Sequence, residues 1–214
     1  MTTFPPKPTP QETLEILKAG NRLFAACQDG IPHFDAAYRM KLAHGPRSEH
    51  VLATVVGCSD CRVTPEFAFH SGPGDLFVIR TAGFACLSDE SLASADFGVV
   101  QLQSPLLVVL GHTDCKAVRI ALEKTEIDSP ELSPSLKSTL QRLTDTLDAN
   151  MSEADRDRSV WDDDSVNEMV KKNVFLTVER IVKSSPGIQK LQAACKLLVV
   201  PALYQLESGL VEWL

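Results

Sequence analysis

Four short apolar runs leave this chain few possible folds, because each run suits a β-strand that is buried on both faces. The runs are VLATVVGC (51–58), DLFVIRTA (75–82), LLVVLGH (106–112) and KLLVVPALYQL (196–206). Strands with such unbroken apolar character occur in sheets covered on both sides, and these sheets are mostly parallel because helices connect their strands. The pattern therefore predicts an α/β fold with a mainly parallel central β-sheet flanked by helices.

Amphipathic segments between the runs predict the connecting helices. The expected helices cover residues 9–28, 35–43, 65–70, 91–103, 115–124, 136–147 and 165–184. Thr9 and Thr13 are both possible caps of the first helix, which follows a proline-rich arm over residues 1–10. Residues 126–164 are polar and acidic, and we expect them to hold one helix. Because no clear linker or internal repeat is present, we expect one domain over residues 1–214, with 1–28 as its N-terminal arm and helix.

Charge and hydropathy argue against several classes of partner. The formal net charge is −7 and no cluster of Lys and Arg stands out, so we do not expect nucleic acid as a partner. No apolar run approaches the roughly 18–20 residues of a membrane span. The N-terminus also lacks the basic and then apolar pattern of a secretory signal. We therefore expect a cytoplasmic protein with no membrane partner, in which the six cysteines are buried core residues, catalytic thiols or metal ligands.

Two cysteines and a histidine follow the first and third apolar runs. Cys58 ends the first run, His112 ends the third, and Cys115 comes three residues later in GHTDC. Ligands of open parallel sheets bind beyond the carboxyl ends of the strands, so we expect these three side chains to meet there. A Cys₂His set leaves one position of a zinc tetrahedron open, as catalytic zinc sites do. The set also suits zinc better than magnesium or calcium.

Cys61 leaves two other interpretations of the same segment open. One is a closed structural zinc site of three cysteines and His112, which would make the protein a non-catalytic zinc module. The other is a thioredoxin-like dithiol of Cys58 and Cys61, which is disfavoured because the segment lacks the usual helix N-terminus that lowers a thiol pKa. The remaining cysteines are expected to be small buried apolar residues; they are Cys27, Cys86 and Cys195.

The two motifs around these residues resemble the signature of the β-class carbonic anhydrase family. That signature has Cys-x-Asp-x-Arg after one strand and His-x-x-Cys after a later one, and here the segments read CSDCR (58–62) and HTDC (112–115). Three longer stretches are also similar to family segments, the last of them to a closing strand and hairpin: PGDLFVIRTAGF, SADFGVVQLQSPLLVVLGHTDC and LLVVPALYQLESGLVEWL. The resemblance extends from about residue 12 to the C-terminus and is weakest over 126–164.

The resemblance implies a zinc enzyme in which Cys58, His112 and Cys115 bind the Zn²⁺ ion. It gives catalytic roles to Asp60, which would orient the zinc-bound water, and to Arg62, which would hold Asp60 by a paired hydrogen bond. The implied reaction is hydration of carbon dioxide to bicarbonate by zinc-bound hydroxide. The alternative is hydrolysis of carbonyl sulfide or carbon disulfide at the same zinc, with release of hydrogen sulfide.

Three departures from the family pattern concern the substrate pocket. Lys116 stands where the family commonly has glycine, Thr81 where it often has asparagine, and HGPRSEHVLA lacks a glutamine that the family often has there. A less polar pocket would favour a sulfur-containing substrate. Candidates for the apolar lining are Val63, Phe67, Ala82, Phe84 and Leu87. Gly57 and Gly111 precede two of the expected ligands, where a small residue allows a close backbone approach.

The resemblance finally implies an assembly of several copies. Family members pair through their sheet edges and exchange N-terminal helices, so we expect a homodimer or homotetramer in which helix 12–28 packs on a partner chain. The same apolar face could instead cover the helix's own sheet, which would allow a monomer.

Overall fold

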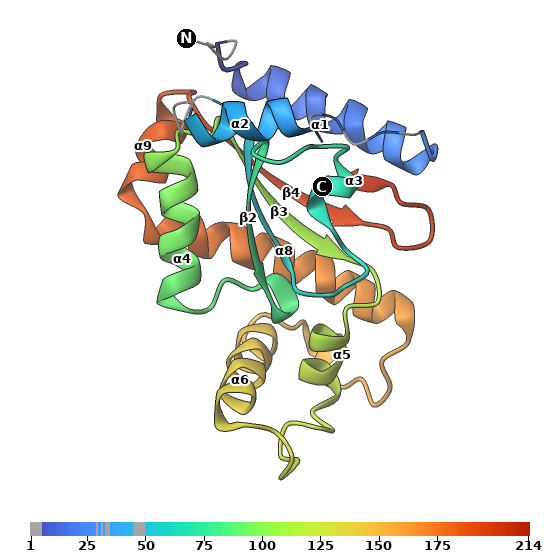
Figure 1. Ribbon diagram of the computed structural model, residues 1–214. Coiled ribbons are helices and arrows are strands. Elements are labelled where there is room, and N and C mark those ends of the chain that lie inside the picture. The colour runs from blue at the N-terminus through green and yellow to red at the C-terminus, as the bar shows by residue number, and fades with distance from the viewer. Residues whose placement is uncertain (1–5, 29, 31, 33–34, 45–49) are drawn as a thin grey trace.

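A computed structural model describes residues 6–28, 30, 32, 35–44 and 50–214. Within these residues five strands form one sheet in the order β2-β1-β3-β4-β5 (Figure 1). The strands are β1 (Ala53–Cys58), β2 (Leu76–Thr81), β3 (Leu106–His112), β4 (Leu198–Tyr204) and β5 (Val211–Trp213). β1 pairs in parallel with β2 and β3, β3 pairs in parallel with β4, and β5 runs antiparallel to β4. The predicted α/β fold with a mainly parallel sheet is confirmed.

Helices connect the strands and cover both faces of the sheet. They are α1 (Pro10–Ala25), α2 (Ala36–His44), α3 (Pro65–Ala68), α4 (Asp89–Asp96), α5 (Lys116–Glu123), α6 (Pro134–Asp148), α7 (Glu153–Arg156), α8 (Asp163–Ser184) and α9 (Pro186–Ala193). A 3₁₀ turn, η1 (Ala82–Phe84), follows β2, and a π-helical turn, η2 (Phe97–Gln101), continues α4. In the described part of the chain, no helix has both the length and the apolar character that a membrane crossing needs.

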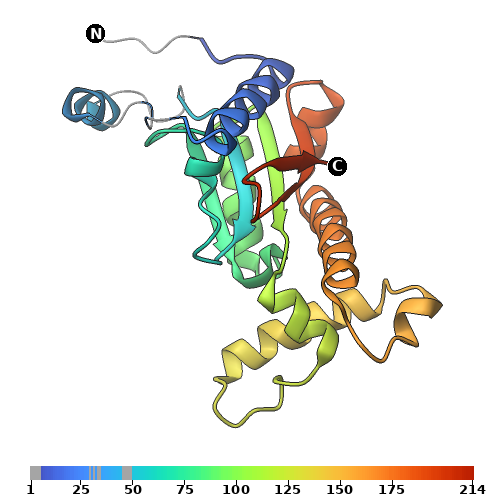
Figure 2. The ribbon, with the colours of Figure 1, turned by 90° about the vertical axis from the view of Figure 1, so that its right-hand side faces the viewer.

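Alternating side chains of the strands build one apolar cluster on each face of the sheet. On one face Leu106 of β3 packs in a cluster with Leu17 of α1. On the other face Leu107 belongs to a cluster with Val174 of α8, the helix that runs along one side of the sheet in Figure 2. All four side chains are fully buried, and burial of each contributes about 1.5–3 kcal/mol. The central place of the sheet therefore follows from its continuous apolar runs.

The N-terminal helix begins at a capping box and packs on the sheet of its own chain. Of the two possible caps, Thr9 is the one used: its hydroxyl accepts the Glu12 N–H, and the Glu12 side chain accepts the Thr9 N–H. Leu14 and Leu17 then point into the core. A Cβ at Gly20 would lie 2.0 Å from the Phe69 carbonyl oxygen, so a glycine lets α1 approach the segment after α3.

Several element predictions were wrong in detail. The helix expected over 91–103 begins at Asp89 after the cap Ser88 and changes to a π-helical turn after Asp96. Residues 126–164 contain α7 as well as α6, and α9 was not predicted. β2 lies at the edge of the sheet, so only Ile79 of its six residues is buried and the prediction of burial on both faces fails there. In the predicted arm over residues 1–10, the first five residues lie outside the described part of the chain.

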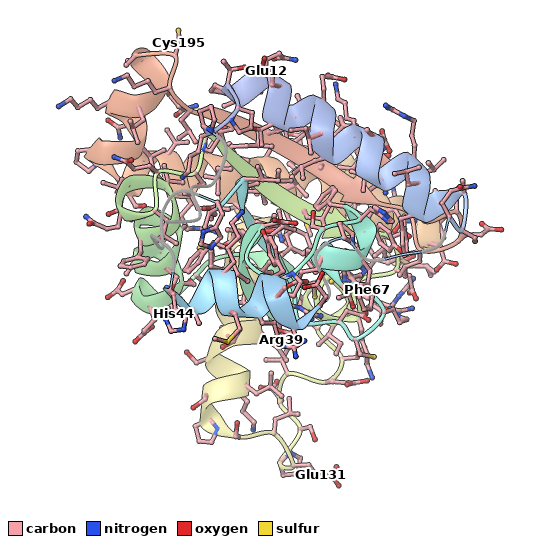
Figure 3. All side chains as sticks on the ribbon, turned by 45° about the horizontal axis from the view of Figure 1, so that its top comes forward. Glu12, Arg39, His44, Phe67, Glu131 and Cys195 are labelled. Carbon is pink, nitrogen blue, oxygen red and sulfur yellow. The ribbon has the colours of Figure 1, made fainter. Side chains whose placement is uncertain are left out.

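Two of the cysteines expected in the core lie at the surface. Cys86 is buried, but Cys27 and Cys195 are exposed. Both exposed cysteines lie just after the last turn of a helix and have a positive φ angle, 52° for Cys27 after α1 and 54° for Cys195 after α9. Figure 3 shows Cys195 at the periphery of the molecule.

Gly111 allows β3 to approach α8, and this close approach generates a prediction about stability. A Cβ at Gly111 would lie 2.6 Å from Val174 Cγ2 and 3.1 Å from Val170 Cγ1, whereas a Cβ at Gly57 would meet its nearest described atom, on Pro65, at 3.8 Å. The expectation of close approach is thus confirmed at Gly111 and wrong at Gly57. We expect Gly111→Ala to lower the free energy of unfolding by about 1–3 kcal/mol through overpacking.

Gly57→Ala is the matched control, since it adds the same methyl group to the neighbouring strand at a position with room for it. Urea titrations of both variants measure the effect. Equal losses in the two variants would contradict the explanation by close approach.

Candidate metal centre

Parallel pairing of β1 with β3 brings the three expected ligands together. Cys58 is the last residue of β1, His112 is the last residue of β3, and Cys115 is the residue just before α5. The register pairs Gly57 with Leu110, so both strands end at the same edge of the sheet. All three side chains are buried, with exposed fractions of 4%, 0% and 1%. The expected convergence at the strand ends is therefore present.

The distances within this cluster fit a tetrahedral metal ion. Cys58 Sγ and Cys115 Sγ lie 4.0 Å apart, and one ligand atom from each of the three residues lies within 4.8 Å of the others. Two zinc–sulfur bonds of about 2.3 Å at a tetrahedral angle place their sulfurs about 3.8 Å apart. The donor set of two sulfurs and one imidazole nitrogen is also one that zinc prefers.

The His112 ring is oriented with one nitrogen left for a ligand. Nδ1 lies 2.8 Å from the Thr113 carbonyl oxygen, which can only accept a hydrogen bond, so Nδ1 carries the proton of the neutral ring. Nε2 then has a free lone pair, and although it is buried it has no hydrogen-bond partner among the described residues. A buried, unpartnered acceptor is costly, and a bound cation would relieve that cost.

The contact between the two thiols shifts their pKa values in opposite directions. The contact with Cys115 lowers the pKa of the Cys58 thiol to about 4, because it stabilises the thiolate. The same contact, together with burial, raises the pKa of Cys115 well above its ordinary value. Cys58 is therefore the thiol of the pair that ionises more readily, and a divalent cation bound between the two sulfurs would displace the protons that remain on them.

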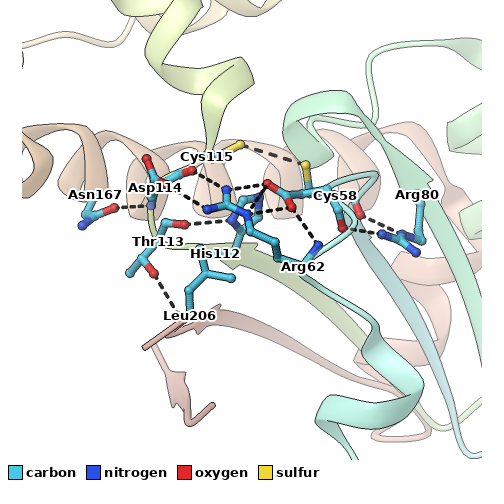
Figure 4. A network of polar contacts seen from close by, with 10 residues as sticks. Cys58, Arg62, Arg80, His112, Thr113, Asp114, Cys115, Asn167 and Leu206 are labelled. Atoms are coloured by element: carbon cyan, nitrogen blue, oxygen red, sulfur yellow. Dashed lines mark hydrogen bonds and ion pairs between the residues drawn. The ribbon is translucent and has the colours of Figure 1, made fainter. Parts of the chain in front are cut away.

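Asp60 and Arg62 form a bidentate ion pair beside the cluster. Figure 4 shows Arg62 close to His112 and Cys58. Arg62 donates from Nε to Asp60 Oδ1 at 3.0 Å and from Nη2 to Oδ2 at 2.7 Å. These hydrogen bonds hold the pKa of Asp60 at about 2 and raise the pKa of Arg62. Asp60 Oδ2 lies 3.9 Å from His112 Nε2, so the carboxylate reaches the edge of the cluster while Arg62 holds both of its oxygens.

Three further residues of the site were missed in the sequence. Arg80 of β2 donates to the carbonyl oxygens of Cys58 at 2.8 Å and of Asp60 at 2.6 Å, which fixes the loop after β1. Asp114 accepts from Arg62, and Asn167 of α8 accepts from the Asp114 N–H. Asp114 could have been noticed, because it lies inside the His-x-x-Cys segment. Asn167 lies on α8, 53 residues further along the chain, and carries no such signal.

Cys61 does not join the ligand cluster. The potential metal-binding group found among the described residues contains Cys58, His112 and Cys115, and Cys61 is exposed. A closed site of three cysteines and His112 is therefore not supported. A tetrahedral ion bound by the imidazole and the two sulfurs would have a fourth coordination position, and Cys61 is not placed to fill it.

Sequence and fold comparisons agree on one family. Residues 53–211 match the family model described as carbonic anhydrase. The chain is 30% identical to carbonic anhydrase 2 of Mycobacterium tuberculosis, over 95% of this chain and 92% of that protein. It is 32% identical to the carbonic anhydrase of Mycolicibacterium smegmatis, over 97% and 94% of the two lengths. Its fold is similar to a tetrameric β-carbonic anhydrase of Sordaria macrospora, with a TM-score of 0.70 and 21% identity over 95% and 97% of the two chains.

The chain belongs to the β-class carbonic anhydrase family. A second solved β-carbonic anhydrase, from Coccomyxa in complex with acetazolamide, has a similar fold, with a TM-score of 0.68 and 24% identity over 94% of this chain and 85% of that one. The resemblance inferred from the two motifs is thus confirmed at the level of family and fold.

The expected pocket-lining residues of this β-carbonic anhydrase family member have different surroundings. Val63 and Phe84 are fully buried core residues, and Phe67 on α3 is about half exposed (Figure 3). Ala82 and Leu87 line a cavity of about 250 Å³ beside Thr81 and Arg142. Thr81 pairs with Cys58 across β2 and β1, so this cavity opens next to the strand that carries the first cysteine.

The Asp60–Arg62 pair generates a prediction about acid stability. Because the pKa of Asp60 falls from 3.8 to about 2 in the folded protein, its carboxylate stabilises the fold only while it is ionised. Its contribution is complete above about pH 4 and is lost as the pH falls toward 2. In metal-free protein, we expect the free energy of unfolding to fall more between about pH 4 and pH 2 in wild type than in Asp60→Asn. Urea titrations at several pH values measure this difference. Parallel pH curves for the two proteins would show that the pair does not stabilise the fold.

Proposed function

We propose that this chain is a zinc-dependent carbonic anhydrase, a lyase that hydrates carbon dioxide to bicarbonate. The proposal rests on one observation: a buried cluster of two cysteine sulfurs and an unpartnered imidazole nitrogen lies beside a carboxylate held by Arg62. In this proposal Cys58, His112 and Cys115 bind the ion. The relatives from the two mycobacterial species, both named carbonic anhydrases, support the same reaction class.

The chemistry of the cluster's residues suits this reaction. Zinc bound there supplies a nucleophile at neutral pH by lowering the pKa of water to about 7. Asp60, with a pKa of about 2, is ionised at neutral pH and can only accept hydrogen bonds. It therefore holds the attacking water by its O–H and leaves an oxygen lone pair free to meet the carbon of carbon dioxide. Arg62 keeps this carboxylate in one orientation because two of its N–H groups are bound to it.

Carbon dioxide is the substrate that we propose, ahead of carbonyl sulfide or carbon disulfide. All three substrates would meet the same nucleophile, so the ligand cluster does not discriminate between them. The relatives named above are carbonic anhydrases, and nothing in the described part of the site favours a sulfur-containing substrate. Hydrolysis of a sulfur-containing substrate, which the departures from the family pattern at Thr81 and Lys116 had suggested, is therefore without support.

We also propose that the protein assembles as a homodimer or homotetramer in the cytoplasm. The Sordaria macrospora relative is tetrameric. In this chain α1 covers its own sheet with Leu14 and Leu17, while Ile16 and Leu23 on the same helix are exposed by 45% and 42%. These apolar side chains are available for contact with a second copy.

Asp60→Asn tests the catalytic role of the carboxylate. We expect the variant to keep its zinc and to lose about a hundredfold in turnover, because the amide no longer orients the attacking water. Stopped-flow hydration of carbon dioxide with a pH indicator measures the rate, and elemental analysis measures the zinc. Asp128→Asn, which removes the same charge from an exposed loop residue, is expected to match wild type. Full activity of zinc-loaded Asp60→Asn would refute the role of Asp60.

The same zinc-loaded wild-type preparation is then assayed for sulfide release from carbonyl sulfide. We expect hydration of carbon dioxide to be the faster reaction. Faster sulfide release would refute carbon dioxide as the main substrate, but it would not contradict the proposed zinc ligands.

Cys58→Ser tests the ligand set. We expect the variant to lose most of its bound zinc, because a serine hydroxyl is a much weaker zinc ligand than a thiolate. Cys61→Ser is the matched control, since it makes the same change three residues away at a cysteine outside the cluster. Elemental analysis after dialysis gives the zinc content of both. A full zinc complement in Cys58→Ser would remove Cys58 from the proposed ligands.

A further inference from the structure

Arg62 has a second carboxylate partner whose role the proposed reaction does not explain. Its Nη1 donates to Asp114 Oδ2 at 2.9 Å, and its Nη2 donates to the Asp114 carbonyl oxygen at 3.1 Å. Asp114 lies between His112 and Cys115 in sequence. We propose that Asp114 is a positioning residue that binds a second edge of the Arg62 guanidinium, and so fixes the orientation of Asp60. The inference rests on the proposed function and deepens it.

The contacts divide the guanidinium between two acceptors. One edge, Nε and Nη2, faces the Asp60 carboxylate, and the other edge, Nη1 and Nη2, faces Asp114. The Arg62 side chain is 46% exposed, so packing alone does not immobilise it. A planar fork that is bound along two edges cannot rotate without breaking hydrogen bonds on both sides. Asp114 therefore restricts the motion that would release Asp60.

Asp114 is itself anchored to distant parts of the fold. Its backbone has a φ of 54°, a conformation that aspartate and asparagine tolerate better than most residues. Its N–H donates to Asn167 Oδ1 on α8 at 2.9 Å. The preceding Thr113 donates its N–H to the Tyr204 carbonyl at 3.0 Å and accepts the Leu206 N–H at 3.1 Å. Figure 4 shows the resulting chain of contacts through Arg62, Asp114 and Asn167.

The anchored network sets where the Asp60 carboxylate can lie. With Arg62 held, Asp60 Oδ2 stays 3.9 Å from His112 Nε2, at the edge of the ligand cluster. Without Asp114, Arg62 keeps a single carboxylate partner among the described residues and swings more freely into solvent. Asp60 then loses the fixed orientation on which its hydrogen bond to the attacking water depends. The opposing explanation is that the Arg62–Asp114 contact is an exposed ion pair without effect on the site, since many exposed ion pairs contribute little.

Asp114→Asn tests the proposal, because asparagine keeps the shape and tolerates the positive φ but removes the charge. We expect kcat/KM for carbon dioxide hydration to fall about fivefold, the size that weakening one exposed charged contact allows. In the Asp60→Asn background we expect no further loss, since Asp114 acts only through Arg62 and Asp60. Asp148→Asn, which breaks the similarly exposed Lys124–Asp148 pair, is the matched control and is expected to retain wild-type activity. A fivefold loss that persists in the Asp60→Asn background, or no loss at all, would overturn the proposal.

A measurement on metal-free protein separates this inference from the proposed function. The Arg62 Nε–H signal in ¹⁵N-labelled protein is assigned by its loss in Arg62→Lys. We expect this proton to exchange with water several-fold faster in Asp114→Asn and in Asp114→Gly, which also tolerates the positive φ, and to stay at the wild-type rate in Asp148→Asn. An unchanged exchange rate in both Asp114 variants would refute the positioning role. Absence of hydration activity in zinc-loaded wild type would refute the proposed function, while the Arg62 signal would still decide the role of Asp114.

Discussion

Parallel pairing of β1 with β3 is the interaction on which the rest of the site depends. It places Cys58 and His112 at one edge of the sheet although 54 residues separate them, and the short turn after β3 brings Cys115 back to the same place. The pairing is stable because both strands are buried: all six residues of β1 and all seven of β3 lie in the interior. Apolar burial on the two faces of the sheet thus supports a polar cluster at its end.

The burial of the polar groups at that edge decreases with their distance from the ligand cluster. The sulfurs and the imidazole are almost fully buried, Asp60 is mostly covered, and Arg62 and Asp114 face solvent. Hydrogen bonds from neighbouring residues hold the inner groups. Arg80 donates to the backbone carbonyls of Cys58 and Asp60, the Thr113 carbonyl accepts from the His112 ring, and Arg62 donates to the Asp60 side chain. Such outer contacts decide the tautomer and direction of the inner groups.

The sequence predicted the features that depend on local pattern. The apolar run 106–112 coincides with β3, and the N-cap of α1, Thr9, is one of the two threonines that the sequence offered as caps. The cluster of Cys58, His112 and Cys115 was predictable because Cys58 and His112 end apolar runs and Cys115 comes three residues after the second of them. Contacts between distant side chains were not predictable: nothing in the residues around Asn167 shows that α8 passes Asp114. The exposure of Cys27 and Cys195 was missed because both lie just past helix ends, where chain geometry and not composition decides burial.

The distance along the chain between the cysteines has a consequence for biogenesis. Between Cys58 and Cys115 lie β2, α4 and β3, so the cluster does not exist until β1 and β3 have paired. A nascent chain offers only scattered thiols and imidazoles, which bind an ion weakly and without selectivity. Under the proposed function, the ion therefore enters only after β1 and β3 have paired, and not while the chain is still unfolded.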